Sequence, residues 1–241
     1  NYGDEYKVMG LAPYGEATGI DKMRKIVRLL PDGRFELELN YFLHHSEGVS
    51  MVWESGEPTI GRVFAPALEA LFGPARSKEE PLDAKHWNIA ASAQAMYEEA
   101  FFHILNHVHA KTGLSAVALA GGCAMNSVAN GKVLGRTGFK DIYVQSAAGD
   151  AGGAIGAAFA VWNQALDNPR SFEMEHAYWG PEFSAEQIRG LLDQRAADLD
   201  AQACQVSQIA DEEKLCRLTA EAISKGKVIG GFYSAPSLLT A

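Results

Sequence analysis

Residues 115–158 read SAVALAGGCAMNSVANGKVLGRTGFKDIYVQSAAGDAGGAIGAA and contain two successive strand–turn–helix units. Each unit begins with a short apolar run, at residues 115–120 and again at 141–144. A turn containing glycine follows each run, and a helical stretch comes next, to about residue 134 in the first unit and over 151–165 in the second. This succession is typical of an α/β layer whose strand ends form a ligand crevice. The sequence therefore predicts an α/β fold with a binding site at these two turns.

A long helix is expected just before this layer. From about Lys85 to Lys111, apolar side chains recur at helical spacing, and Gly113 stands where it can end the helix. Towards the N-terminus, the same spacing predicts helices over residues 21–30 and 59–71.

The segments between these helices have a different character. Residues 31–33 read PDG, a turn that stops the first helix. Residues 35–39 alternate apolar and polar side chains, which predicts a half-buried antiparallel strand. Residues 44–58 are expected to be irregular or weakly extended.

The composition shifts after residue 169, which indicates a domain boundary near residues 170–183. Two amphipathic helices, over 184–198 and 211–225, and a final strand over 227–233 are expected beyond it. The predicted division is one domain over residues 1–170 and a second region over 171–241.

Composition and charge exclude several classes of protein. With 47% hydrophobic and 21% charged residues over 241 positions, the chain is expected to be globular. Its formal net charge of −9, with neither sign gathered in a block, argues against a nucleic-acid partner. No run approaches the roughly 18 apolar residues of a membrane span, and residues 1–5 lack the features of a signal peptide. A cytoplasmic protein without a membrane partner is expected.

Cysteine and histidine give little sign of a metal site. Cys123, Cys204 and Cys216 form no CxxC pair and are odd in number, so reduced, mostly buried thiols are expected.

The paired histidines have a structural interpretation as well. His103 and His107 have the spacing of a helical metal chelate but lie among apolar residues without an acidic partner, so they are interpreted as structural or surface residues. His44 and His45 could not face one site if the chain were extended there.

The glycine turns are candidates for binding a nucleotide, because backbone N–H groups can approach an anion where no side chain intervenes. Neither the GxxxxGK[ST] nor the GxGxxG fingerprint is present. Gly121, Gly122 and Asn126 suit a nucleotide lying across the first turn; the alternative is tight strand-to-helix packing with Asn126 as a capping group. Asp150 suits either an N-cap or a metal ligand at the mouth of the crevice.

Three ordered motifs resemble the nodulation-type O-carbamoyltransferases, a family that includes antibiotic-tailoring enzymes. The motifs are GDEYKVMGLAPYG at residues 3–15, LAGGCAMN at 119–126 and GDAGGAIGAA at 149–158. The resemblance covers the chain to about Tyr233, and the segments YWGP (178–181) and GKVIG (226–230) look like the family's connector.

The resemblance implies a fold and a reaction. The first domain would be part of an actin/hexokinase-like (ASKHA) domain, followed by a helical connector and the start of a YrdC-like domain. In such enzymes the YrdC-like domain, with Mg²⁺, makes carbamoyladenylate from carbamoyl phosphate and ATP. The first domain then transfers the carbamoyl group to a hydroxyl of a small-molecule acceptor beside a metal, expected to be Fe²⁺.

The resemblance also implies roles for particular residues. Asp150 matches the family's metal-ligand aspartate, and no catalytic residue is identified. The positions expected to contact the nucleotide are Glu5, Lys7, Gly121, Gly122, Asn126 and Gly149.

The sequence departs from the family's pattern at both ends. The family's paired-histidine metal motif lies upstream of the region where this chain begins, and SAPSLL at 234–239 replaces the motif expected to open the YrdC-like domain. The chain is therefore expected to be a central piece that cannot catalyse the complete reaction alone.

Two other functions compete with carbamoyl transfer. An ATP-dependent sugar or metabolite kinase of the same fold would also bind ATP on glycine turns. A non-catalytic nucleotide-binding module is the second alternative. The acceptor is left open, since a nodulation-factor sugar, an aminoglycoside and a macrolide are all compatible with the sequence, and so is a homo-oligomer.

Overall fold

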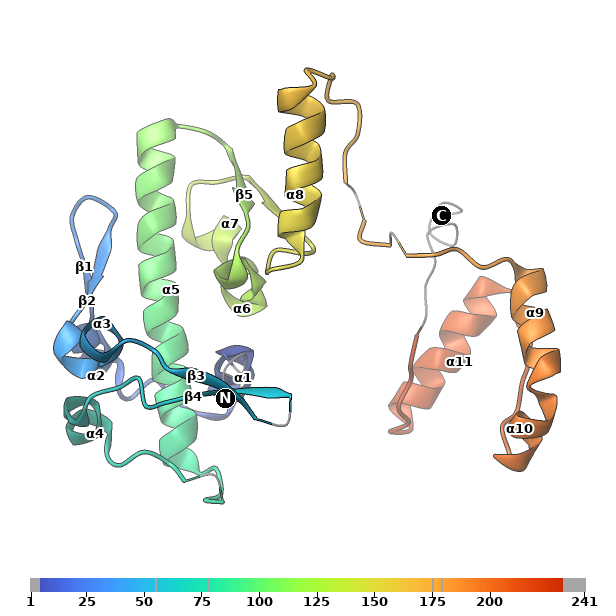
Figure 1. Ribbon diagram of the computed structural model, residues 1–241, viewed down its shortest axis with the longest axis horizontal. Helices are drawn as coiled ribbons and strands as arrows, with labels where there is room; N and C mark the ends of the chain where they lie inside the picture. The colour runs from blue at the N-terminus through green and yellow to red at the C-terminus, as the bar shows by residue number, and fades with distance from the viewer. Residues whose placement is uncertain (1–4, 55, 78, 175, 179, 232–241) are drawn as a thin grey trace. The chain divides into compact units, whose positions relative to one another are not determined.

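A computed structural model of the chain describes residues 5–231, apart from residues 55, 78, 175 and 179 (Figure 1). The structure is mixed α/β. It divides into two compact units, Asn1–Pro169 and Arg170–Ala241, each of which is described by itself.

The long helix α5, Ala84–Thr112, is the central element of the first unit (Figure 1). Asp83 caps its N-terminus, where the carboxylate accepts from the backbone N–H of His86 at 3.3 Å. Gly113 ends the helix in the left-handed conformation, at φ 66°, which a residue without Cβ adopts readily. The helix predicted from about Lys85 to Lys111 is confirmed.

The predicted strand–turn–helix layer is also confirmed. Strands β5, Ala116–Leu119, and β6, Asp141–Val144, pair in parallel, with Leu119 opposite Val144 at their carboxyl ends. Helix α8, Gly152–Ala160, follows β6 and continues into one π-helical turn over Val161–Ala165.

The first helical stretch of the layer is broken rather than continuous. It consists of a 3-10 turn, Gly122–Met125, and the short helices α6, Ser127–Asn130, and α7, Val133–Arg136. The helix breaks at Gly131 and Lys132, between α6 and α7, and the low helix propensity of glycine favours an interruption at Gly131.

A small apolar core joins α5 to this layer. Phe102 and Leu105 of α5 pack with Val133 of α7 and with Phe139, all of them buried. The strand residues that pack against this cluster are Val117, Leu119 and Ile142. The core therefore fixes the layer, and with it the two turns, on the side of α5.

In chain order, the helices and strands of the N-terminal part of the first unit are α1 (Glu5–Leu11), α2 (Ile20–Ile26), β1 (Val27–Leu29), β2 (Phe35–Leu37), α3 (His44–Glu47), β3 (Met51–Glu54), β4 (Glu57–Ile60) and α4 (Pro66–Phe72). Of these, α1, α2 and β1 pack against α5. Strands β1 and β2 form one antiparallel hairpin, and β3 and β4 form another.

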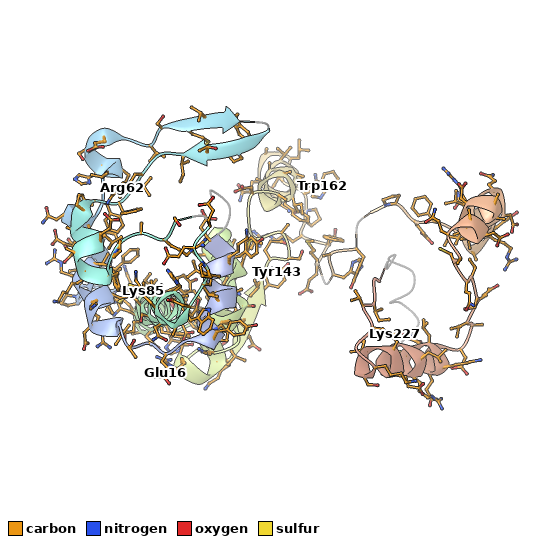
Figure 2. The ribbon with its side chains drawn as sticks, turned by 90° about the horizontal axis from the view of Figure 1, so that it is seen from below. Glu16, Arg62, Lys85, Tyr143, Trp162 and Lys227 are labelled. Carbon is orange, nitrogen blue, oxygen red and sulfur yellow. The ribbon has the colours of Figure 1, made fainter. Side chains whose placement is uncertain are left out.

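The loop between α1 and α2 lies against α5. The backbone N–H of Glu16 donates to Asn88 Oδ1 at 2.8 Å, and that of Gly19 donates to Ser92 Oγ at 2.9 Å. Glu16 is seen beside α5 in Figure 2. Two backbone donors of this loop are thus bonded to side chains of one helix, which fixes the position of the loop.

Two predictions in this part are wrong in detail. The helix expected over 21–30 ends at Ile26, because Val27–Leu29 pairs with Phe35–Leu37 across the turn at 31–33. The strand expected over 35–39 is antiparallel as predicted but ends at Leu37, and its apolar face is not covered, since Phe35 and Leu37 are 46% and 38% exposed.

Two further predictions in this part differ from the structure. Residues 44–58, expected to be irregular or weakly extended, are extended in strand β3 and at the start of β4 but also contain the short helix α3. The helix expected over 59–71 begins only at Pro66, after β4 has ended at Ile60. Proline suits the first turn of a helix and keeps the preceding residue extended, as Ala65 is at ψ 159°.

The second unit contains three helices among its described residues: α9 (Ala185–Gln194), α10 (Ala196–Ala201) and α11 (Glu212–Ser224). The two predicted amphipathic regions are therefore helical. Ser184 caps α9 in a capping box with Gln187. The strand expected over 227–233 does not form over residues 227–231, and residues 232 and 233 lie outside the described part of the chain.

Two properties of the whole chain complete the fold. No helix of the described residues combines the length and the apolar character needed to cross a membrane. Cys123, Cys204 and Cys216 are free and exposed, so the expectation that they are mostly buried is wrong. Cys123 lies in an open turn, and the other two lie in the second unit, in which the described residues show no buried core.

Candidate nucleotide-binding turns

The two turns predicted to form the site lie side by side at the carboxyl ends of β5 and β6. The backbone N–H of Gly121 donates to the carbonyl oxygen of Ala148 at 2.7 Å. The N–H of Gln145 donates to Leu119 O at 3.3 Å, which continues the contact beyond the strands. A Cβ atom placed on Gly149 would lie 3.0 Å from Met125 Sδ, so the turns also pack closely. The structure thus brings Gly121 and Gly149 together.

Gly121 and Gly122 play different parts in the first turn. Gly121 has φ 94°, a conformation that residues with a side chain rarely adopt. Gly122 is exposed, and a Cβ atom placed on it would meet no atom within 4 Å. The first glycine shapes the turn, and the second leaves the backbone open to solvent.

Asn126 ends this turn and caps the next helix. Its Oδ1 accepts from the backbone N–H of Ala129 at 3.0 Å, so the capping interpretation is confirmed. Its side-chain amide also pairs with that of Gln94 on α5: Asn126 Nδ2 donates to Gln94 Oε1 at 2.9 Å, and Gln94 Nε2 donates to Asn126 Oδ1 at 3.1 Å. Contact of Asn126 with a nucleotide stays a prediction.

A buried polar network continues from this amide pair. Gln94 Nε2 also donates to Glu98 Oε1 at 3.1 Å, and Lys132 Nζ donates to the same oxygen at 2.6 Å. Arg136 lies 4.0 Å from the other carboxylate oxygen of Glu98. Sequence reasoning missed Gln94 and Glu98; the available signal was a pair of polar residues four apart on a helix that is otherwise apolar along this stretch.

A cavity of about 310 Å³ borders this network. It lies between the motif at residues 3–15 and helix α5. Its lining includes Met9, Ala12, Pro13, Gln94, Glu98 and Lys132.

Asp150 is exposed and does not cap α8. The N-cap position of α8 is Ala151, which has no side-chain cap bond, so the N-cap alternative is wrong. The chain remains in a turn through Ala151, which places the carboxylate outside the first turn of the helix. Its role as a metal ligand stays a prediction.

Glu5 and Lys7 lie on α1, and both side chains are exposed. Residues 1–4, which include the start of the first motif, lie outside the described residues. Ser127 Oγ lies 3.9 Å from Met9 Sδ, so α1 approaches the residue that follows Asn126. Contact of Glu5 and Lys7 with a nucleotide stays a prediction.

The histidines do not form a metal site in the described part of the chain. His103 Nε2 lies 2.7 Å from Leu30 O, and the ring of His107 lies against Gly33 in the turn of the first hairpin, in agreement with their structural interpretation. His44 and His45 lie in a helix rather than in extended chain, and their ring centroids are 5.9 Å apart. Among the described residues, no three histidine, cysteine, aspartate or glutamate side chains gather as a metal site.

Tyr97 of α5 contacts the first turn directly, since its hydroxyl donates to Cys123 O at 2.8 Å. Burial, and secondly the charge of Cys123, raises the pKa of Tyr97 to about 12. An ordinary tyrosine titrates near pH 10, so the neutral form is favoured by folding. Tyr97 therefore contributes stability that is complete below about pH 10 and is lost as the pH rises towards 12.

We expect Tyr97→Phe to remove this titration and about 1 kcal/mol of stability, the usual contribution of one hydrogen bond. Phenolate absorbance recorded against pH for the unmodified chain and the variant gives the difference curve of one tyrosine. A midpoint near pH 12 is expected for that curve. A midpoint near 10 would show that the hydroxyl is neither buried nor bonded to the turn.

Comparisons with known proteins agree on one family. Residues 1–159 match the family model of the carbamoyltransferase N-terminus. The chain is 39% identical over 234 residues to the uncharacterized protein sll1178 of Synechocystis. It is 34% identical over 233 residues to the nodulation protein NolO of Bradyrhizobium diazoefficiens and 32% identical over 229 residues to the nodulation protein NolNO of Sinorhizobium fredii. These alignments cover 94–95% of the chain but 29–36% of the relatives, so the chain spans about a third of their length.

Proposed function

This chain belongs to the carbamoyltransferase family, and we propose that it forms part of an enzyme that transfers a carbamoyl group from carbamoyladenylate to a hydroxyl of a small-molecule acceptor. The acceptor would be a sugar or a natural product. Carbamoyladenylate would be made from carbamoyl phosphate and ATP in a YrdC-like domain. The domain over residues 1–170 would be the actin/hexokinase-like part.

The pair of glycine turns is the observation that carries this proposal. The bond between Gly121 N and Ala148 O holds the two turns together at the carboxyl edge of a parallel strand pair, where α/β proteins bind nucleotides. Gly122 leaves the backbone accessible there, because no atom lies within 4 Å of the position that a Cβ would occupy. A nucleotide lying across the first turn would meet backbone groups at Gly121 and Gly122.

The proposed chemistry needs positioning more than a nucleophile. The acceptor oxygen attacks the carbamoyl carbon, a new C–O bond forms, and the bond from that carbon to the phosphate oxygen breaks, which releases AMP. The hydroxyl proton must leave, and we assign no residue of this chain as its base. The turn residues Gly121, Gly122, Asn126 and Gly149 would hold the adenylate in reach of the acceptor, with Glu5 and Lys7 on its ribose and phosphate side.

The family resemblance also implies a metal ion, expected to be Fe²⁺. Asp150 offers one exposed carboxylate, a hard oxygen ligand, beside Gly149. The described residues supply no group of three metal-binding side chains, so they do not by themselves fit a metal ion. We therefore propose Asp150 as a single ligand and derive no step through the metal.

We expect Gly122→Leu to weaken binding of a non-hydrolysable carbamoyladenylate analogue by at least about tenfold, because the new side chain would occupy the space above the turn. Gly135→Leu is the matched control, since a Cβ at that position in α7 also meets no atom within 4 Å. Isothermal titration calorimetry measures the affinities, and thermal midpoints close to that of the unmodified chain verify folding.

Equal affinities of Gly122→Leu and Gly135→Leu for the analogue would show that the first turn is not part of the binding site. Transfer of a labelled carbamoyl group from carbamoyladenylate to an added alcohol, by a full-length relative, separates the proposal from the kinase alternative, which predicts a phosphorylated product.

A further inference from the structure

The side-chain amide of Asn126 belongs to a hydrogen-bond network with two fixed ends. One end can only donate a hydrogen bond, and the other can only accept one. At one end, Oδ1 accepts from the backbone N–H of Ala129, which is only a donor. At the other end of the network, the Glu98 carboxylate accepts from Gln94 Nε2 and from Lys132 Nζ. An ionised carboxylate is only an acceptor. Gln94 lies between these two ends and bonds to both Asn126 and Glu98.

These fixed ends determine the orientation of both amides. If Gln94 were turned over, its oxygen would face Glu98 Oε1 and Asn126 Oδ1, the two acceptors to which its nitrogen now donates at 3.1 Å each. If Asn126 were turned over, its NH₂ group would face the N–H of Ala129. Each reversal replaces hydrogen bonds by contacts between like groups, which is costly where the groups are part-buried.

The hydrogen-bonding capacity that remains on Asn126 follows by counting. Oδ1 has two acceptor sites, and Gln94 Nε2 and Ala129 N occupy both. Nδ2 has two N–H donors, and one of them is bonded to Gln94 Oε1. One N–H donor is left for a further partner, and no acceptor is left.

We infer that Gln94 and Glu98 are positioning residues that fix the amide of Asn126, so that this turn offers its ligand one side-chain N–H donor and no acceptor. The inference rests on the proposed function for the identity of the ligand. An acceptor oxygen on the phosphate or ribose of the adenylate is then the partner that Asn126 recognises. Glu98 is well suited to the task, because its side chain is only 10% exposed and its Oε1 accepts from both Gln94 and Lys132. Arg136 of α7 lies 4.0 Å from the other carboxylate oxygen.

The first test follows the Asn126 NH₂ signals by NMR in the free 241-residue chain, with the signals assigned by their loss in Asn126→Asp. We expect these signals to shift or broaden in Glu98→Gln, because an amide at position 98 can also donate and no longer fixes Gln94. Glu99→Gln is the control on the same helix, since Glu99 bonds to Arg24 instead. Thermal midpoints recorded alongside separate a change of orientation from unfolding.

The second test measures binding of AMP by calorimetry. Asn126→Asp can still accept from Ala129 but has lost its donors and places a carboxylate near the anionic ligand. We therefore expect it to bind AMP at least about tenfold more weakly. Glu98→Gln should weaken AMP binding by a smaller factor, and Glu99→Gln should leave it unchanged.

The outcomes distinguish this inference from the proposed function. Unaltered Asn126 signals in Glu98→Gln, or undiminished AMP binding by Asn126→Asp, would overturn the inference. If the unmodified chain does not bind AMP while the NMR shift is seen, the nucleotide site is refuted and the positioning of Asn126 by Glu98 stands.

Discussion

Gly15→Ala should destabilise the first unit by about 3 kcal/mol, at the upper end of what overpacking usually costs. A Cβ atom at this position would lie 2.2 Å from both the carbonyl carbon and the oxygen of Trp87, and 2.6 Å from the backbone nitrogen of Asn88. These are backbone atoms of a 29-residue helix and cannot move aside as the tip of a side chain could. The loop would have to leave α5.

The measurement is urea unfolding of the variant beside Gly10→Ala, five residues earlier in the same motif. Nothing lies within 4 Å of a Cβ on Gly10, and this residue lies inside α1, where alanine is favoured over glycine by about 0.5–1 kcal/mol. The control should therefore be as stable as the unmodified chain or slightly more so. Similar midpoints for the two variants would mean that the loop does not pack on α5 as described.

A displaced loop would also alter the cavity beside the polar network. Gly15 lines that cavity together with Gln94 and Glu98. Gly15→Ala is thus expected to disturb the neighbourhood of Asn126 as well as stability, whereas Gly10→Ala disturbs neither.

The elements that could be predicted from the sequence are those with a local signal. Helix α5 has periodic apolar residues over its whole length and a glycine at its end, and β5 and β6 are apolar runs bounded by turns. The elements that could not be predicted depend on partners elsewhere in the chain. Val27–Leu29 continues a helical pattern but becomes a strand because Phe35–Leu37 returns to pair with it.

The same division holds for the candidate site. The cap formed by Asn126 depends on a residue three positions away and could be predicted. The contact with Gln94 joins residues 32 positions apart, and the bond from Lys132 to Glu98 joins residues 34 apart, so neither has a local signal. The bond that holds the two turns together, Gly121 N to Ala148 O, likewise exists only once the strands have paired.

Phe139→Ala is expected to cost about 3–5 kcal/mol, the usual effect of removing a fully buried phenylalanine. Its side chain is 1% exposed, and it packs with Phe102, Leu105 and Val133 in the core between α5 and the strand pair. Its ring also meets that of His109 edge-on, with centroids 5.0 Å apart. Truncation would leave a cavity that the surrounding helix and strands cannot close.

Phe35→Ala is the matched control, because Phe35 lies on the first hairpin and is 46% exposed. Its loss should cost only about 1 kcal/mol, since about half of its surface is already exposed to water. Chemical denaturation of both variants gives the comparison, and AMP binding gives its consequence for the site. Phe139 stands two residues before β6, whose carboxyl end carries the second turn, so loosening this core should weaken binding even under conditions where the chain remains folded. If Phe139→Ala were no more costly than Phe35→Ala, this core could not be what holds the two turns in place.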